Sequence, residues 1–366
     1  MKLVTMEDST ATGQVNMLEE RLLVSQNQNG GLKTLPFILA NWAFETSAYC
    51  ALMADMILYL MGAYGLPLSM GTKIVFIFST ATSTMQFFGA ILSDSLFGRF
   101  PMIAFGSISI LVGTILLWLT TMLPDLRPQP CDISNSTKTC EAATFYQLSV
   151  ICSSLLLISV GRGGIESSSL AFGADQLYSK IHNSERASLS FDKYISRYFQ
   201  VNLPAVIVGG TVVVYVQEQL GWKLGYKISV ILLLFAVLSI FVASPLYVKL
   251  KARKGMFSEL AGVIVVSFKH RNLKLPSEDM DGFYNAKEES PLTIPSNKLR
   301  SSGGSKGIDQ ISPILSTSFI LYSTFSQGSI EVILVKTMDR HITPNFEIPA
   351  GAFGFVGPLF AMAWLV

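Results

Sequence analysis

The chain has 366 residues, of which 50% are hydrophobic and only 14% are charged. Because soluble domains carry about 25% charged residues, this composition indicates either a membrane protein or an unusually large buried core. The formal net charge of +2 is too small to favour a strongly charged partner, and we expect no interaction with nucleic acid.

Residues 1–30 are polar and include the stretch NMLEERLLVSQNQNGG, which continues to residue 31. They lack the short apolar run followed by a cleavage site that is typical of a secretory signal. We therefore expect a cytosolic N-terminal tail.

The apolar runs that follow are long enough to cross a membrane. A helix needs about 20 mainly apolar residues to span the hydrocarbon core, and residues 35–61, LPFILANWAFETSAYCALMADMILYLM, supply 27. Pro204 and Gly209-Gly210 interrupt the fifth run, which membrane helices tolerate. Six spans are expected at about 35–61, 71–92, 100–123, 145–170, 198–216 and 226–246, and two more at about 311–335 and 348–366.

The distribution of Lys and Arg predicts the orientation of these spans, because cytosolic loops are enriched in basic residues. The second loop carries Arg99, the fourth carries Lys180, Arg186 and Lys193, and residues 247–310 carry eleven Lys and Arg. The loops after the first, third and fifth spans carry few Lys or Arg residues. The N-terminus and the 247–310 stretch are therefore expected in the cytosol.

Six spans, a basic cytosolic linker and further spans are typical of transporters built from two helical bundles. We expect an all-α membrane protein of four parts. These are a tail at 1–30, a complete six-helix bundle at 31–246, a linker at 247–310, and about two helices of a second bundle at 311–366.

The stretch GAILSDSLFGRF, residues 89–100, joins the second and third spans. Glycine suits a tight turn between helices, and Asp94 and Arg99 can form an ion pair there. An ordinary charged loop would also contain such residues. The spacing of Gly89, Asp94, Gly98 and Arg99, however, resembles the signature loop of the major facilitator superfamily.

Five further stretches carry a more specific resemblance. GGLKTLPFILAN, AFGADQL, ASPLYVKLKA, TMDRHI and FEIPAGAFG occur in this order, and together they resemble the plant nitrate/peptide transporter family. This family is the proton-dependent oligopeptide transporter branch of the superfamily. The resemblance implies a twelve-helix fold, alternating access, and proton-driven uptake of nitrate, short peptides or, in plants, some hormones and glycosylated metabolites.

The first span departs from the family pattern, in which two glutamates three residues apart are followed by a Lys or Arg. Here the corresponding residues are Trp42, Glu45 and Thr46, so only the second acid remains. We expect Glu45 to face the bundle interior as the remaining proton-coupling candidate. The alternative is a structural carboxyl, since an unpaired acid at this depth should stay protonated.

The fourth span also departs from the family. Its usual Gly-x-Gly-Gly-Ile is followed by a base, whereas here Glu166 takes that place and Arg162 lies four residues earlier. Residues at this spacing share a helix face, so we expect them to pair. Each charge at a helix centre costs about 2.5–3.5 kcal/mol. The lower yield of folded protein expected for Arg162→Ala should then be partly recovered when Glu166→Ala is added.

Two functions remain open. The chain is either a transporter that moves a small solute by proton-coupled symport, or a transport-inactive family member that acts as a membrane fragment or partner subunit. With about two helices of the second bundle, the chain alone is not expected to complete a transport cycle, and a helper chain would cover the exposed face. Cys131 and Cys140 share a polar loop, and whether they form a disulfide stays open.

The sequence contains neither an HExxH motif nor a Cys-x2-Cys pair. These are common markers of metal and redox sites. We therefore expect no enzyme, no metal and no cofactor.

The predicted orientation can be tested by thiol labelling. A cysteine placed within 247–310, in a variant without the four native cysteines, should react with a membrane-impermeant maleimide only after the cells are permeabilised. Labelling of intact cells at the linker would contradict the orientation.

Overall fold

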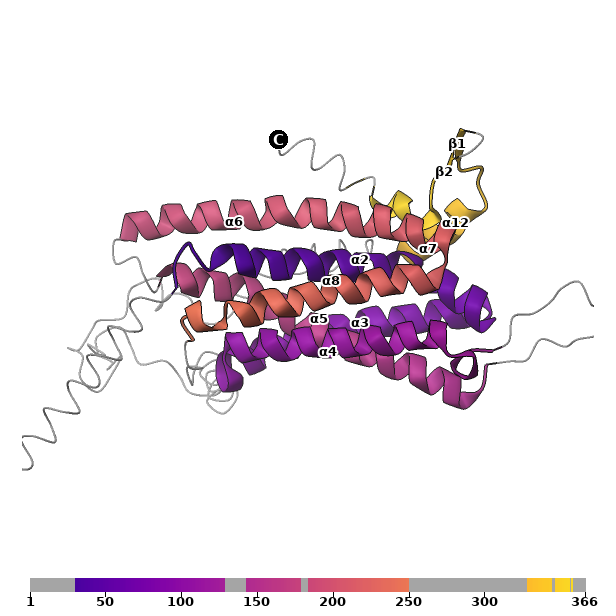
Figure 1. Cartoon of the computed structure of the whole chain (residues 1–366), viewed down its shortest axis with the longest axis horizontal. Helices are drawn as coiled ribbons and strands as arrows, with labels where there is room; N and C mark the ends of the chain where they lie inside the picture. The colour runs from indigo at the N-terminus through magenta and orange to yellow at the C-terminus, as the bar shows by residue number, and fades with distance from the viewer. Residues whose placement is uncertain are drawn as a thin grey trace, which may run out of the picture. The chain divides into compact units, whose positions relative to one another are not determined.

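The computed structural model describes residues 30–128, 143–178, 184–249, 328–343, 346–355 and 357. Almost all of these residues are helical, and the long helices run side by side along the horizontal axis of Figure 1. They belong to a unit formed by residues 1–256 and 329–366. The second unit, residues 257–328, lies almost wholly outside the described residues.

Eight α-helices are described, together with shorter helical turns and one small hairpin. The helices are α2 (Leu35–Tyr64), α3 (Leu68–Leu92), α4 (Arg99–Met122), α5 (Phe145–Tyr178), α6 (Ser184–Ile207), α7 (Val214–Leu220), α8 (Trp222–Val242) and α12 (Gly328–Lys336). The π-helical turns are η1 (Ser93–Phe97) and η3 (Val208–Val213), and the 3₁₀ turns are η2 (Pro124–Leu126), η4 (Ser244–Leu246) and η5 (Ala350–Phe355). Strands β1 (His341–Thr343) and β2 (Phe346–Glu347) pair antiparallel.

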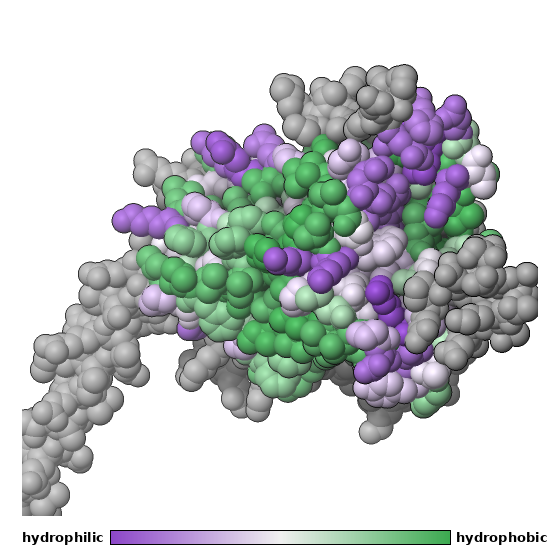
Figure 2. Space-filling view, turned by 45° about the vertical axis from the view of Figure 1, so that its right-hand side comes forward, coloured by the Kyte–Doolittle hydropathy of each residue, from purple (hydrophilic) through white to green (hydrophobic). Residues whose placement is uncertain are grey.

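Six helical segments in the described part of the chain are long and apolar enough to cross a membrane, and each overlaps one of the six expected spans. Large apolar side chains such as Phe87, Phe105 and Phe235 point outward from them, and broad hydrophobic areas are visible on the face in Figure 2. Such outward apolar surface suits contact with lipid. The segments are Leu35–Tyr64, Leu68–Phe97, Arg99–Met122, Phe145–Leu177, Leu189–Leu220 and Trp222–Leu246.

The fifth span differs from its expected form, because its helix begins at Ser184 and continues through Pro204 without a break. Proline lacks an N–H and disturbs the hydrogen-bond ladder of a helix. The π-helical turn η3 follows, in which each hydrogen bond spans one more residue than in an α-helix. Helix α7 then continues the span. π turns of this kind interrupt many α-helices at functional positions.

Glycine begins the third and the sixth spans. Gly98 precedes α4 with φ 87° and Gly221 precedes α8 with φ 91°, a backbone conformation that L side chains rarely adopt. A π-helical turn lies in the span before each of them, η1 before Gly98 and η3 before Gly221. The two turns thus share the positive-φ glycine, although η1 adjoins Gly98 whereas α7 separates η3 from Gly221.

Little of the expected second bundle is described. The seventh span is represented by α12 and the eighth by η5, and the hairpin of β1 and β2 between them was not expected from the sequence. The tail at 1–29, most of the linker, and Cys131 and Cys140 lie outside the described residues. Their predicted roles stay predictions.

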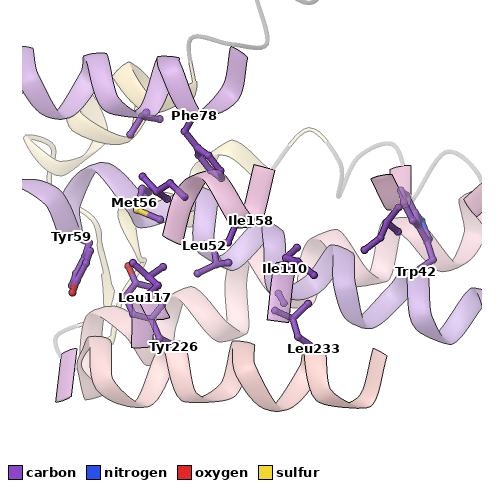
Figure 3. Close-up of a cluster of buried hydrophobic side chains, with 14 of the residues drawn as sticks. Trp42, Leu52, Met56, Tyr59, Phe78, Ile110, Leu117, Ile158, Tyr226 and Leu233 are labelled. Carbon is purple, nitrogen blue, oxygen red and sulfur yellow. The ribbon is translucent and has the colours of Figure 1, made fainter. Parts of the chain in front are cut away.

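The bundle interior is filled by apolar side chains from α2, α3, α4, α5 and α8 (Figure 3). Helix α5 approaches two neighbours closely at glycines. A Cβ atom on Gly161 would lie 2.6 Å from the Gly106 carbonyl oxygen of α4, and one on Gly163 would lie 2.6 Å from the Met85 carbonyl carbon of α3. Small residues allow helix backbones to approach in membranes, so these glycines fix the position of α5.

Three of the stretches that carry the family resemblance meet where α2 begins. The Gly31 amide donates to the Gln176 carbonyl oxygen at 2.8 Å, and the Gln176 side chain makes hydrogen bonds of 2.9 and 2.8 Å to the backbone of Val248. These contacts tie the start of α2, the end of α5 and the segment after α8 together.

Replacing Gly161 by leucine should destabilise the protein, because the side chain would meet the α4 backbone. Overpacking of this kind costs about 1–3 kcal/mol. We expect a lower midpoint of thermal unfolding for the purified variant in detergent. Gly62→Leu is the matched control, since a Cβ atom there has no neighbour within 4 Å. Equal unfolding midpoints for the two variants would contradict the proposed close contact.

Candidate functional site

The expected signature loop contains an ion-pair cluster centred on Arg99. Its Nε lies 3.1 Å from Asp94 Oδ1, so the predicted pair is confirmed, and its Nη1 lies 2.7 Å from Asp175 Oδ1 and 3.2 Å from the Ala171 carbonyl oxygen. The loop between α3 and α4 is thereby attached to α5. Asp175 was not singled out from the sequence, although it belongs to the quoted stretch AFGADQL.

The two glycines of this loop have different roles. Gly98 adopts the positive φ described above and makes the turn. Gly89 instead lies within α3, where a Cβ atom would approach Ser167 Oγ of α5 to 2.8 Å. It therefore permits a helix crossing rather than a turn.

The central site is formed by Glu45 on α2 and by Arg162 and Glu166 on α5. Arg162 Nη1 donates to Glu45 Oε2, and Arg162 Nε lies 3.1 Å from Glu166 Oε2. The predicted pairing of Arg162 with Glu166 is confirmed. The expectation that Glu45 is unpaired is wrong, because Arg162 of α5 supplies a guanidinium where position 46 lacks the family's base.

Aromatic rings enclose the Arg162 guanidinium. Its Cζ lies 4.9 Å from the ring centre of Trp42 and 4.6 Å from that of Tyr49, distances suited to cation–π attraction. Trp42 donates from Nε1 to Asn202 Oδ1 at 3.0 Å and stacks on Tyr198 with ring centres 4.9 Å apart. The ring of Trp42 is thus held by α6 while it faces the arginine.

Thr46 also faces the guanidinium, since its buried Oγ1 lies 3.5 Å from Arg162 Nη1. It offers an acceptor where the family pattern has a base. The structure therefore brings together every residue that the sequence singled out in the first and fourth spans, namely Trp42, Glu45, Thr46, Arg162 and Glu166.

Solvent exposure increases across this charged triad. The Glu45 side chain is 0% exposed, that of Arg162 is 8% exposed and that of Glu166 is 34% exposed. Glu45 Oε1 has no hydrogen-bond partner among the described residues. Two ionised carboxylates and one guanidinium carry one net negative charge, so the triad is electrically neutral only when one of the carboxylates is protonated. The site can therefore hold a proton, with Glu166 as its more accessible member.

Sequence reasoning missed Tyr49, Tyr198 and Asn202. Helical spacing could have found Tyr49, which lies four residues after Glu45 on the same face of α2. Tyr198 and Asn202 lie in the stretch SFDKYISRYFQVN, residues 190–202, where the charged Asp192, Lys193 and Arg197 hide the buried face from a sequence reading. In the structure Tyr198 is buried whereas those charged side chains are exposed.

No group of three or more His, Cys, Asp or Glu side chains in the described ranges could hold a metal ion.

Comparison with known proteins identifies the family. A sequence model of the POT family, PTR2, matches residues 100–366. Protein NRT1/ PTR FAMILY 1.1 of Arabidopsis thaliana is 38% identical over 94% of the chain and 64% of its own length. Protein NRT1/ PTR FAMILY 1.2 of the same plant is 36% identical over 92% of the chain and 61% of its own length. The chain thus spans less than two thirds of these relatives.

Solved structures show the same fold at low sequence identity. The in meso crystal structure of the POT family transporter PepTSo has a TM-score of 0.61 and 14% identity, and the match covers 92% of this chain and 68% of that one. A POT family transporter in complex with 5-aminolevulinic acid has a TM-score of 0.64 and 13% identity, with 93% and 71% covered. The expected all-helical, major facilitator-type fold is confirmed. This multi-pass membrane protein therefore belongs to the POT family of transporters, among the NRT1/PTR relatives.

Proposed function

We propose that the protein moves a small solute across the membrane by proton-coupled symport, and that the Glu45–Arg162–Glu166 triad binds the coupled proton. The observation that carries the proposal is the single buried guanidinium shared by two carboxyl groups from α2 and α5. A solute such as nitrate or a short peptide is supported by the names of the relatives and by the peptide transporters among the similar structures.

The charge balance of the triad supplies the coupling. With both acids ionised the triad carries one net negative charge, which is costly away from water. A proton on Glu45 removes that charge and weakens its bond to Arg162. The guanidinium is then free to pair with Glu166 alone or with an anionic group of the solute. Proton binding in this way changes the contact between α2 and α5.

Uptake in liposomes tests the function, with the chain reconstituted together with a helper chain that completes the second bundle, because the chain alone is not expected to complete a transport cycle. We expect saturable uptake of nitrate or a dipeptide that increases when the outside is made acidic. Glu45→Gln should remove this increase, because an amide can neither bind nor release the proton, while any solute exchange remains. Asp125→Asn is the matched control, since Asp125 is an exposed carboxylate outside the triad. Unchanged pH dependence in Glu45→Gln would exclude the role of Glu45.

The second function, an inactive partner subunit, predicts a different result. Folded chain would then take up both solutes no faster than empty vesicles even when it is reconstituted with the helper chain.

The triad also makes a prediction about stability. Removing one partner of a buried ion pair typically costs about 3–5 kcal/mol, so Arg162→Ala should lower the yield of folded protein and its unfolding midpoint. Since Glu45 is the fully buried partner, addition of Glu45→Gln should recover much of the loss. The change first expected to compensate, Glu166→Ala, should recover little, because Glu166 is partly solvated. Better recovery with Glu166→Ala than with Glu45→Gln would contradict the view that the Glu45 contact is the more important of the two.

A further inference from the structure

Helix α2 contains a second buried carboxyl group, Asp55, that the sequence analysis did not single out. Its exposed fraction is 1%, and neither Oδ1 nor Oδ2 has a hydrogen-bond partner among the described residues. Most buried polar atoms in proteins do have a partner, and an isolated buried carboxylate is especially costly. The surroundings of Asp55 therefore suit its neutral, protonated form.

The turn η5 covers Asp55. A Cβ atom on Gly351 would collide with Asp55 Oδ1 and would lie 3.1 Å from the Ala54 Cβ atom, so the backbone of η5 rests directly on this part of α2. The Ala350 amide donates to Glu218 Oε1 of α7 at 2.8 Å. At the far end of the turn, the Phe355 ring meets Gly210 of η3. The docked position of η5 thus keeps water from Asp55.

Arg340, one of the two basic groups that attract a charge on Asp55, is already paired. Arg340 lies 3.2 Å from Glu218 and 2.5 Å from Glu347, and it donates to the Ile348 carbonyl oxygen at 3.0 Å. None of the ion pairs within the described ranges includes Asp55. Because Arg340 already pairs with Glu218 and Glu347, it does not balance the charge of an ionised Asp55.

The remaining titratable groups that face Asp55 do not change this balance. Lys336 at the end of α12 attracts a negative charge on Asp55, but its own side chain is exposed, so solvent screens that attraction. Tyr226 of α8 is buried, and its hydroxyl has no hydrogen-bond partner in the described part of the chain. Ionisation of Asp55 is therefore unfavourable while η5 is docked.

We propose that Asp55 is a second proton-binding site and that its proton holds η5 on the six-helix bundle. Undocking of η5 admits water to the carboxyl group, which then releases its proton. Docking takes up one proton, so acid favours the docked state and rising pH favours the undocked state. Asp55 is a different group from the proposed coupling acid Glu45, and its action can be measured without any transported solute.

A thiol at residue 352 reports this equilibrium, because Ala352 lies in η5 and is only 8% exposed when the turn is docked. The full chain, with Ala352→Cys in a variant without native cysteines, is purified in detergent and labelled with maleimide between about pH 5 and about pH 8. The same measurement is made after addition of Asp55→Asn, which supplies an isosteric and permanently neutral side chain. The intrinsic pH dependence of the thiol cancels in the ratio of the two labelling rates.

We expect this ratio, the labelling rate with Asp55 intact divided by the rate with Asp55→Asn, to be near one at the acidic end. It should then increase by up to about tenfold per pH unit, the limit for release of one proton. Gly351→Val should label rapidly at every pH, because its side chain cannot fit over Asp55. The unfolding midpoint gives a second measure, and that of Asp55→Asn should exceed that of the parent protein only at the alkaline end.

A ratio that stays flat or falls with pH would overturn the proposal, even if both proteins label faster at high pH. Such a result would leave the proposed role of Glu45 unaffected, because neither measurement depends on uptake.

Discussion

The bond between the Arg162 guanidinium and the Glu45 carboxylate is the interaction on which the interior of the bundle depends. Both side chains are almost fully removed from solvent, where a charge is stable only beside an opposite charge. The other groups that surround the Arg162 guanidinium in the interior also suit its positive charge. The ring faces of Trp42 and Tyr49, the hydroxyl of Thr46 and the carboxylate of Glu166 all offer negative charge density.

The position of that guanidinium follows from the packing of α5. Gly161 and Gly163, on either side of Arg162 in the sequence, lie against α4 and α3 respectively. Successive helical residues are turned by about 100°, so two residues that flank a third face nearly opposite directions. The residue between them is directed toward neither α4 nor α3. This leaves α2 as the helix that Arg162 reaches, and Glu45 is the acid found there.

The sequence alone predicted the spans well, because length and apolar content determine which segments can cross a membrane. It also predicted the Arg99–Asp94 and Arg162–Glu166 pairs, since both are close in the chain. It failed at contacts between distant segments. The bond from Arg162 to Glu45 joins residues 117 apart, and Asp55 was passed over because nothing in its local sequence indicates that η5 covers it. Pro204 was taken as a break because its effect depends on how η3 rearranges the helix.

The glycine turns at Gly98 and Gly221 have a consequence for how the bundle meets the two sides of the membrane. Each has a positive φ and opens the third span of a group of three. Repeats of three helices within a six-helix half are known in this superfamily, and the two glycines occupy corresponding places in such groups. Three is an odd number, so the second group enters the membrane from the opposite side. The same kind of glycine turn therefore serves both faces of the membrane, once in each orientation.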